Sequence, residues 1–158
     1  MLPHLDFPTT TAVAAAQAAR AAGEPLTSFF RTWVDQHRYI DDQLIPIAAS
    51  AYNLSQAEVL GAVSFYHDFR RTPPGRHVVQ LCGAEACQAM GVRALAAQLA
   101  EQTAPTDKHG TTADGRLTIE TVYCLGLCAN GPAALIDGQP HAALDAGKLD
   151  RLLAEFAP

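Results

Sequence analysis

The sequence predicts an α+β (α/β) protein in two parts: a helical bundle in residues 1–74, and a small mixed sheet with flanking helices in residues 75–158. Three observations lead to this prediction. Apolar residues recur at helical spacing as far as about Arg71. The segment Pro73-Pro74-Gly75 then interrupts the pattern. Beyond it, short segments follow in the order β-α-β-β-β-α, which is typical of a sheet covered by helices.

The N-terminal part begins with an arm and an amphipathic helix within residues 1–23, which are rich in alanine and threonine. Further helices are expected over residues 26–34 and 44–51, and after Ser55. Asp41 or Asp42 is positioned to cap the helix at 44–51. Ser55 and Glu58 match a capping box, in which each side chain accepts a hydrogen bond from the other residue's backbone. Four helices are therefore expected before the break.

In the C-terminal part, strands are expected over residues 77–82 and 117–123, a hairpin over 134–137 and 141–144, and helices over 92–101 and 148–156. Residues 117–123 alternate apolar and polar side chains, which indicates a strand. The dipeptide Asp137-Gly138 is a typical hairpin turn. The polar stretch from Gln102 to Gly115 is expected to be a loop.

Composition excludes several classes of function. The net charge is −5, and the 11 basic residues are scattered, which argues against binding to nucleic acid. No apolar run reaches the ~18 residues that a membrane helix needs, and no basic residue precedes the alanine-rich stretch as it would in a signal peptide. A cytoplasmic protein is expected. No glycine-rich phosphate-binding motif and no catalytic constellation is apparent, so any flavin or nicotinamide must bind on another chain.

The four cysteines, Cys82, Cys87, Cys124 and Cys128, are the strongest functional signal. Their pattern is C-x4-C, then 36 residues, then C-x3-C. Disulfides are unexpected in a cytoplasmic chain, and a thioredoxin-type redox pair would need two residues between its cysteines. Four thiolates suit either a 2Fe–2S cluster or a structural zinc ion, and spacing alone leaves both open.

The residues around the cysteines indicate that the two cysteine pairs lie close together in the fold. Each pair is expected just after a strand, in a turn of small residues such as Gly83 and Gly126. If the two strands are neighbours in one sheet, both turns meet at the same edge. Small residues let backbone N–H groups approach the sulfurs, and these groups stabilise an anionic cluster.

The motifs around these cysteines resemble a known family. The segments LCGAEACQAMG and YCLGLCANGPA, with AEVLGAVSFYHDFRRTPPGRHVVQLC upstream and DGQPHAALDAGKLDRLLAEF downstream, are similar to the thioredoxin-like 2Fe–2S subunit of NADH dehydrogenases. That family includes the small peripheral subunit of respiratory complex I and its relatives in NAD-reducing hydrogenases and formate dehydrogenases. The resemblance covers about residues 25–157. Within the family, FYHDFR, EACQAMG and VYCLGLCANGPAALIDG most resemble the gamma subunit of soluble NAD-dependent formate dehydrogenase.

The resemblance implies a thioredoxin-like domain after the helices, with Cys82, Cys87, Cys124 and Cys128 as ligands of one 2Fe–2S cluster. It implies a non-catalytic electron-transfer subunit that docks on a beta subunit carrying FMN and the NADH site. A molybdenum-containing alpha subunit would oxidise formate elsewhere in the complex. The alternatives are the equivalent subunit of an NADH:quinone oxidoreductase or NAD-reducing hydrogenase, a free-standing ferredoxin and, from another class, a zinc-stabilised interaction module.

Overall fold

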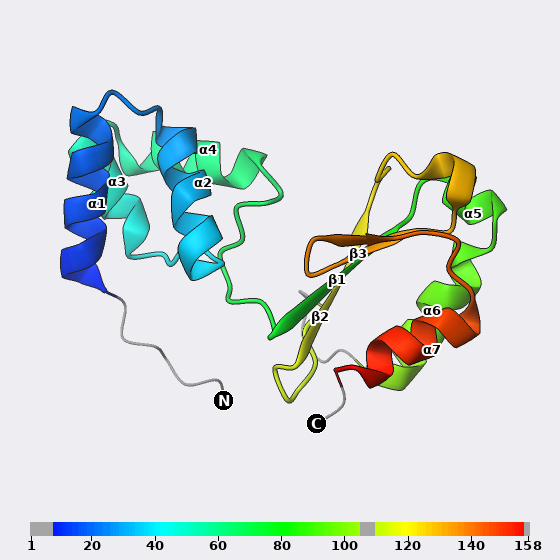
Figure 1. The fold of residues 1–158 in the computed structure, drawn as a ribbon. Helices are drawn as coiled ribbons and strands as arrows, with labels where there is room; N and C mark the ends of the chain where they lie inside the picture. The colour runs from blue at the N-terminus through cyan, green and yellow to red at the C-terminus, as the bar shows by residue number, and fades with distance from the viewer. Residues whose placement is uncertain (1–7, 105–109, 157–158) are drawn as a thin grey trace. The chain divides into compact units, whose positions relative to one another are not determined.

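The computed structural model describes residues 8–104 and 110–156, which form seven α-helices, a short 3₁₀-helix and a four-stranded sheet (Figure 1). The chain divides into two compact units, Met1–Pro73 and Pro74–Pro158, and each is described by itself. Residues 1–7 of the expected N-terminal arm and helix, and residues 105–109 in the middle of the expected loop, lie outside the described residues. Among the described helices, none combines the length and apolar character that a membrane span requires.

The first unit contains helices α1 (Thr9–Ala21), α2 (Leu26–His37), α3 (Leu44–Tyr52) and α4 (Gln56–Phe65). They share one hydrophobic core, in which Phe30, Leu44 and Val59 are fully buried. The core forms because apolar residues three or four apart lie on the same face of each helix. The expected helices are present, whereas their arrangement as a regular bundle stays a prediction.

Local hydrogen bonds decide where two of these helices begin. The predicted capping box is confirmed: the Glu58 backbone N–H donates to Ser55 Oγ at 3.2 Å, and the Ser55 N–H donates to Glu58 Oε2 at 2.8 Å. The predicted cap of α3 is wrong. Gln43 precedes α3 without a side-chain cap, because Asp41 instead accepts a hydrogen bond from the Gln43 N–H at 2.9 Å within the preceding turn.

The second unit is built on a mixed sheet in the strand order β2-β1-β3-β4. Its strands are β1 (His77–Cys82), β2 (Leu117–Val122), β3 (Ala134–Ile136) and β4 (Gln139–His141). Strand β1 is central: it runs parallel to β2, with Cys82 opposite Val122, and antiparallel to β3. The mixed sheet expected from the sequence is therefore confirmed.

Helices α5 (Glu85–Ala89), α6 (Val92–Thr103) and α7 (Ala146–Ala154) complete the second unit. Helices α6 and α7 lie next to each other against the sheet (Figure 1). Leu99 of α6 and Leu149 of α7 are fully buried in the same core as Val79 of β1. This packing fixes the sheet, and with it the strand ends that carry the cysteines.

The hairpin is shorter than predicted. Asp137 and Gly138 both have positive φ, 49° and 80°, which is the geometry of a two-residue type I′ turn. The second strand therefore starts directly at Gln139 and ends at His141, instead of covering residues 141–144. Helix α7 also starts earlier than predicted, because Asp145 caps it by accepting a hydrogen bond from the Lys148 N–H at 2.7 Å.

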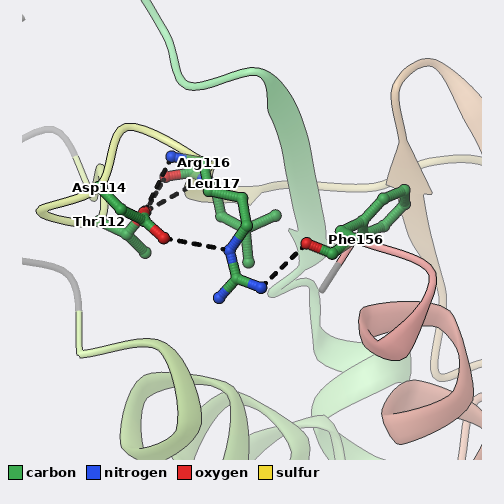
Figure 2. A network of polar contacts seen from close by, with 5 residues as sticks. All are labelled: Thr112, Asp114, Arg116, Leu117 and Phe156. Atoms are coloured by element: carbon green, nitrogen blue, oxygen red, sulfur yellow. Dashed lines mark hydrogen bonds and ion pairs between the residues drawn. The ribbon is translucent and has the colours of Figure 1, made fainter. Parts of the chain in front are cut away.

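The last part of the expected loop is an ordered turn in front of β2 (Figure 2). Thr112 is buried, and its Oγ1 accepts a hydrogen bond from the Leu117 N–H at 3.1 Å. The Arg116 backbone N–H donates to Asp114 Oδ1 at 2.9 Å, and the Arg116 side chain donates to the Phe156 carbonyl at 2.9 Å. Polar residues therefore tie the turn to the end of α7, at the opposite end of β2 from Cys124.

Candidate metal centre

The four cysteines lie in four different segments that meet at one edge of the sheet. Cys82 is the last residue of β1, and Cys87 lies in α5. Cys124 follows β2, and Cys128 begins the 3₁₀-helix η1 (Cys128–Asn130). Because β1 and β2 are parallel neighbours, they end at the same edge and bring the two cysteine turns together.

The thiols are arranged as two pairs. Cys124 Sγ and Cys128 Sγ are 3.7 Å apart, and Cys82 forms a side-chain contact with Cys87. The pairs are also close enough for charge on Cys82 to act on Cys128. All four cysteines are free. Within the described ranges, no three His, Cys, Asp or Glu side chains form a group that could hold a single metal ion.

Burial differs between the two pairs. Cys82 and Cys87 are each 1% exposed, whereas Cys124 and Cys128 lie at the surface. One side of the centre is thus enclosed by the core of the second unit. The other side faces outward, and Tyr123, which precedes Cys124 in the chain, is 77% exposed.

The electrostatic environment favours a thiolate at Cys82. Burial opposes ionisation, but the backbone N–H groups of Ala84, Leu125 and Cys124 donate hydrogen bonds to its sulfur, so its pKa is lowered. The pKa of Cys87 is raised, first by burial and then by its contact with Cys82, although the Ala133 N–H opposes this shift. The centre therefore contains backbone donors aimed at sulfur, as an anionic metal–thiolate group requires.

The exposed pair has its own electrostatic pattern. Contact with Cys124 raises the pKa of Cys128, because a thiol that donates to its neighbour resists losing its proton. A cation bound between these sulfurs would reverse this effect, since metal ligation deprotonates a coordinating thiol.

The backbone around Cys124 has an unusual conformation that serves the site. Cys124 has φ 68° and Gly126 has φ 76°, in the left-handed region that residues other than glycine rarely occupy. This conformation turns the Cys124 and Leu125 N–H groups toward Cys82. A concave run of backbone donors of this kind binds anions.

Gly131 is a part of the site that sequence reasoning missed. A Cβ at this position would lie 3.2 Å from Cys87 Sγ and 3.1 Å from Met90 Sδ. Glycine therefore leaves room beside the sulfur. The Asn-Gly-Pro sequence signals a turn here, but nothing local indicates that the turn approaches Cys87.

Comparison with known proteins identifies relatives of this chain. Residues 14–157 match the family described as thioredoxin-like [2Fe-2S] ferredoxin. One subunit of the NADH-quinone oxidoreductase of Escherichia coli is 32% identical over 121 residues, which are 77% of this chain and 72% of that protein. The HndA subunit of the NADP-reducing hydrogenase of Solidesulfovibrio fructosivorans is 29% identical over 118 residues, which are 75% of this chain and 68% of that protein.

A solved structure has the same fold. The NAD+-reducing [NiFe]-hydrogenase in its air-oxidized state matches 83% of this chain with a TM-score of 0.70 and 31% sequence identity. The match covers 22% of the hydrogenase chain, so the segment similar to this chain is there joined to a much longer polypeptide.

Proposed function

This chain belongs to the thioredoxin-like [2Fe-2S] ferredoxin family, and we propose that it is an electron-transfer subunit with no substrate site of its own. Its single 2Fe–2S cluster would be held by Cys82, Cys87, Cys124 and Cys128. The observation that carries this proposal is the convergence of the two cysteine pairs at the shared end of β1 and β2.

The donor set fits such a cluster. A tetrahedral metal with metal–thiolate bonds of about 2.3 Å holds two sulfurs about 3.8 Å apart. The 3.7 Å between Cys124 Sγ and Cys128 Sγ is close to this value. Four thiolates in two pairs supply two ligands for each of two irons, and the N–H groups directed at Cys82 offset negative charge.

Each part of the chain contributes a separate property to electron transfer. When bound, the cluster takes up and releases one electron at a time. Cys82 and Cys87 anchor it from the buried side, where backbone donors shape its environment. Cys124 and Cys128 are exposed and bring the other side to the surface, where a partner's redox group can come close.

We propose that the partner binds NADH and carries FMN. The two relatives are subunits of an NADH-quinone oxidoreductase and an NADP-reducing hydrogenase. Both enzymes are named for a nicotinamide that they oxidise or reduce, which favours a complex of this kind as the host. A complex of that kind is therefore our first candidate host for this chain.

The second candidate host is an NAD-dependent formate dehydrogenase, in which this chain would be the gamma subunit beside a molybdenum-containing alpha subunit. The segments FYHDFR, EACQAMG and VYCLGLCANGPAALIDG support this candidate. Assays of the complex purified from its source distinguish the hosts: bound molybdenum with formate oxidation favours formate dehydrogenase, and reduction of NAD+ or NADP+ by hydrogen favours the hydrogenase. Quinone reduction with neither of these activities favours the oxidoreductase.

The cluster assignment is tested on the purified chain. We expect two irons and two acid-labile sulfides per chain, and an EPR signal after reduction that Cys124→Ser abolishes or changes. Thr121→Ser, on β2 three residues before Cys124, is the matched control and should leave the signal intact. Stoichiometric zinc without iron would instead support the interaction module, and an unchanged spectrum in Cys124→Ser would contradict the ligand assignment.

A further inference from the structure

The peptide unit between Gly83 and Ala84 lies in the segment that joins Cys82 to Cys87. Its N–H group belongs to Ala84 and donates to the Cys82 sulfur. Its carbonyl group belongs to Gly83 and accepts a hydrogen bond from Gln88 Nε2 at 2.7 Å. Because a peptide unit is planar, a contact that holds the carbonyl also sets the direction of the N–H group. The Gln88 side chain therefore directs a hydrogen-bond donor toward a proposed cluster ligand.

The other contacts of this peptide segment come from β2 and α5. The Gly83 N–H donates to the Val122 carbonyl at 2.7 Å, and a Cβ at Gly83 would lie 2.6 Å from Thr121 Cγ2. Close packing against β2 thus holds the N-terminal side of Gly83. In the first turn of α5, the Gln88 backbone N–H donates to the Ala84 carbonyl at 2.9 Å. This bond keeps the Gln88 side chain next to the peptide that it contacts.

Arg93 determines which end of the Gln88 amide faces this peptide. Arg93 Nη2 donates to Gln88 Oε1 at 2.5 Å. A guanidinium group can only donate, so it selects the amide oxygen and leaves the amide nitrogen facing the Gly83 carbonyl. Hydrogen bonds in series polarise one another, which strengthens the last donor. Here the series runs from Arg93 through Gln88 and the Gly83–Ala84 peptide to the Cys82 sulfur.

We propose that Gln88, oriented by Arg93, is a positioning residue that stabilises the reduced cluster and so raises its reduction potential. Reduction adds one electron, which the redox partner supplies, and the ligand sulfurs share its negative charge. A hydrogen bond to a ligand sulfur strengthens as this charge grows, so it favours the reduced form. The inference rests on the proposed function, because it concerns a bound cluster. It goes beyond that function by naming two residues, apart from the four cysteines, that adjust the potential.

Gln88→Met tests the inference on the cluster-loaded chain. Methionine keeps the length and helix propensity of glutamine but cannot donate to the Gly83 carbonyl. In a stepwise titration with dithionite followed by EPR, the ratio of reduced to oxidised cluster at a fixed potential should fall at least about threefold, as expected for one lost hydrogen bond. The matched control is Gln98→Met, which should leave the ratio unchanged. Gln98 is a half-buried glutamine of α6 whose amide donates to Asp150 Oδ1 at 2.7 Å.

Arg93→Met is the second variant, and it acts from the exposed surface of α6. It should lower the same ratio about twofold, because Gln88 loses the contact that orients its amide. A double variant separates this effect from a direct effect of the Arg93 charge. If Arg93 acts through Gln88, adding Arg93→Met to Gln88→Met leaves the ratio at the value of Gln88→Met alone.

The remaining outcomes contradict the inference. A smaller change in Gln88→Met than the expected one would overturn it, and a further decrease in the double variant would overturn the orienting role of Arg93. If Gln88→Met binds no cluster, Arg93→Met decides: an unchanged ratio, or a decrease that high salt abolishes as a screened charge effect, overturns the inference. A wild-type chain that holds zinc or no cluster would refute the proposed function instead.

Discussion

At the scale of single residues, Gly131 controls the space beside the buried cysteine pair. In Gly131→Ala the new methyl group would press on Cys87 Sγ and Met90 Sδ, at 3.2 and 3.1 Å. Overpacking of this kind costs about 1–3 kcal/mol. We expect the cluster to be incorporated less completely and to lose its visible absorbance faster on heating. Gly61→Ala, at an open position of α4, should leave the absorbance unchanged, and equal behaviour of the two variants would contradict the prediction.

A second residue carries backbone strain near the site. Ala143 has φ 47°, while its N–H donates to the Asn130 carbonyl at 2.6 Å, beside the turn that holds Cys128. The left-handed conformation destabilises a residue with a Cβ by about 1–2 kcal/mol, and glycine avoids this cost. Part of that gain is offset, because glycine has more conformational freedom in the unfolded chain.

Ala143→Gly should therefore stabilise the second unit by about 0.5–1 kcal/mol. Thermal unfolding followed by circular dichroism measures the change. Ala94→Gly, on the exposed side of α6, should do the opposite and lower stability by about 1 kcal/mol. A lower melting temperature in Ala143→Gly would show that the conformation is not strained.

At the scale of elements, the turn before β2 and the end of α7 depend on Arg116. Its side chain is 21% exposed, it pairs with Asp114 at 3.3 Å and it donates to the Phe156 carbonyl at 2.9 Å. Removing these bonds in Arg116→Ala should lower stability by about 1–3 kcal/mol. Hydrogen exchange should speed up in residues 146–156, while the EPR signal stays unchanged. Arg151→Ala, on the exposed surface of α7, is the control. Similar exchange rates in the two variants would contradict the role of Arg116 in holding the end of α7.

The elements also show what the sequence can predict. Strand β1 has its predicted bounds, and α6 and β2 lie within two residues of theirs, because their patterns of apolar residues are local. The meeting of the cysteine turns followed from one assumption, that two strands are neighbours, and the parallel pairing of β1 with β2 bears it out. Strand β4 was misplaced because Gln139 and Pro140 are exposed and carry no periodic signal.

Other features depend on contacts between distant parts of the chain. Thr111 and Thr112 appear in a polar stretch, yet both are buried because Thr111 forms a bridge with Thr118. The left-handed Cys124 and the approach of Gly131 to Cys87 arise only when β1, β2 and the segment before β3 come together. The sequence therefore predicts the donors of the candidate site, whereas the residues that make room for them are found only in the structure.

At the scale of the whole molecule, each of the two units has its own hydrophobic core. Phe30, Leu44 and Val59 belong to the first, and Leu99 and Leu149 belong to the second. Two cores joined by one connection can unfold separately, so the chain need not unfold in a single transition. This separation matters for function, because all four cysteines lie in the second unit.

We therefore expect a core mutation in one unit to destabilise that unit and to leave the other largely unaffected. Phe30→Ala removes a fully buried ring from the first unit and should cost about 3–5 kcal/mol. Helical signal should then be lost at a lower temperature than the visible absorbance of the cluster, and the EPR signal should persist. Leu149→Ala, at a cost of about 2–5 kcal/mol in the second core, should instead lower the temperature at which the cluster is lost. If both variants shift both signals equally, the two units unfold as one, and the cysteines depend on the helical unit for their stability.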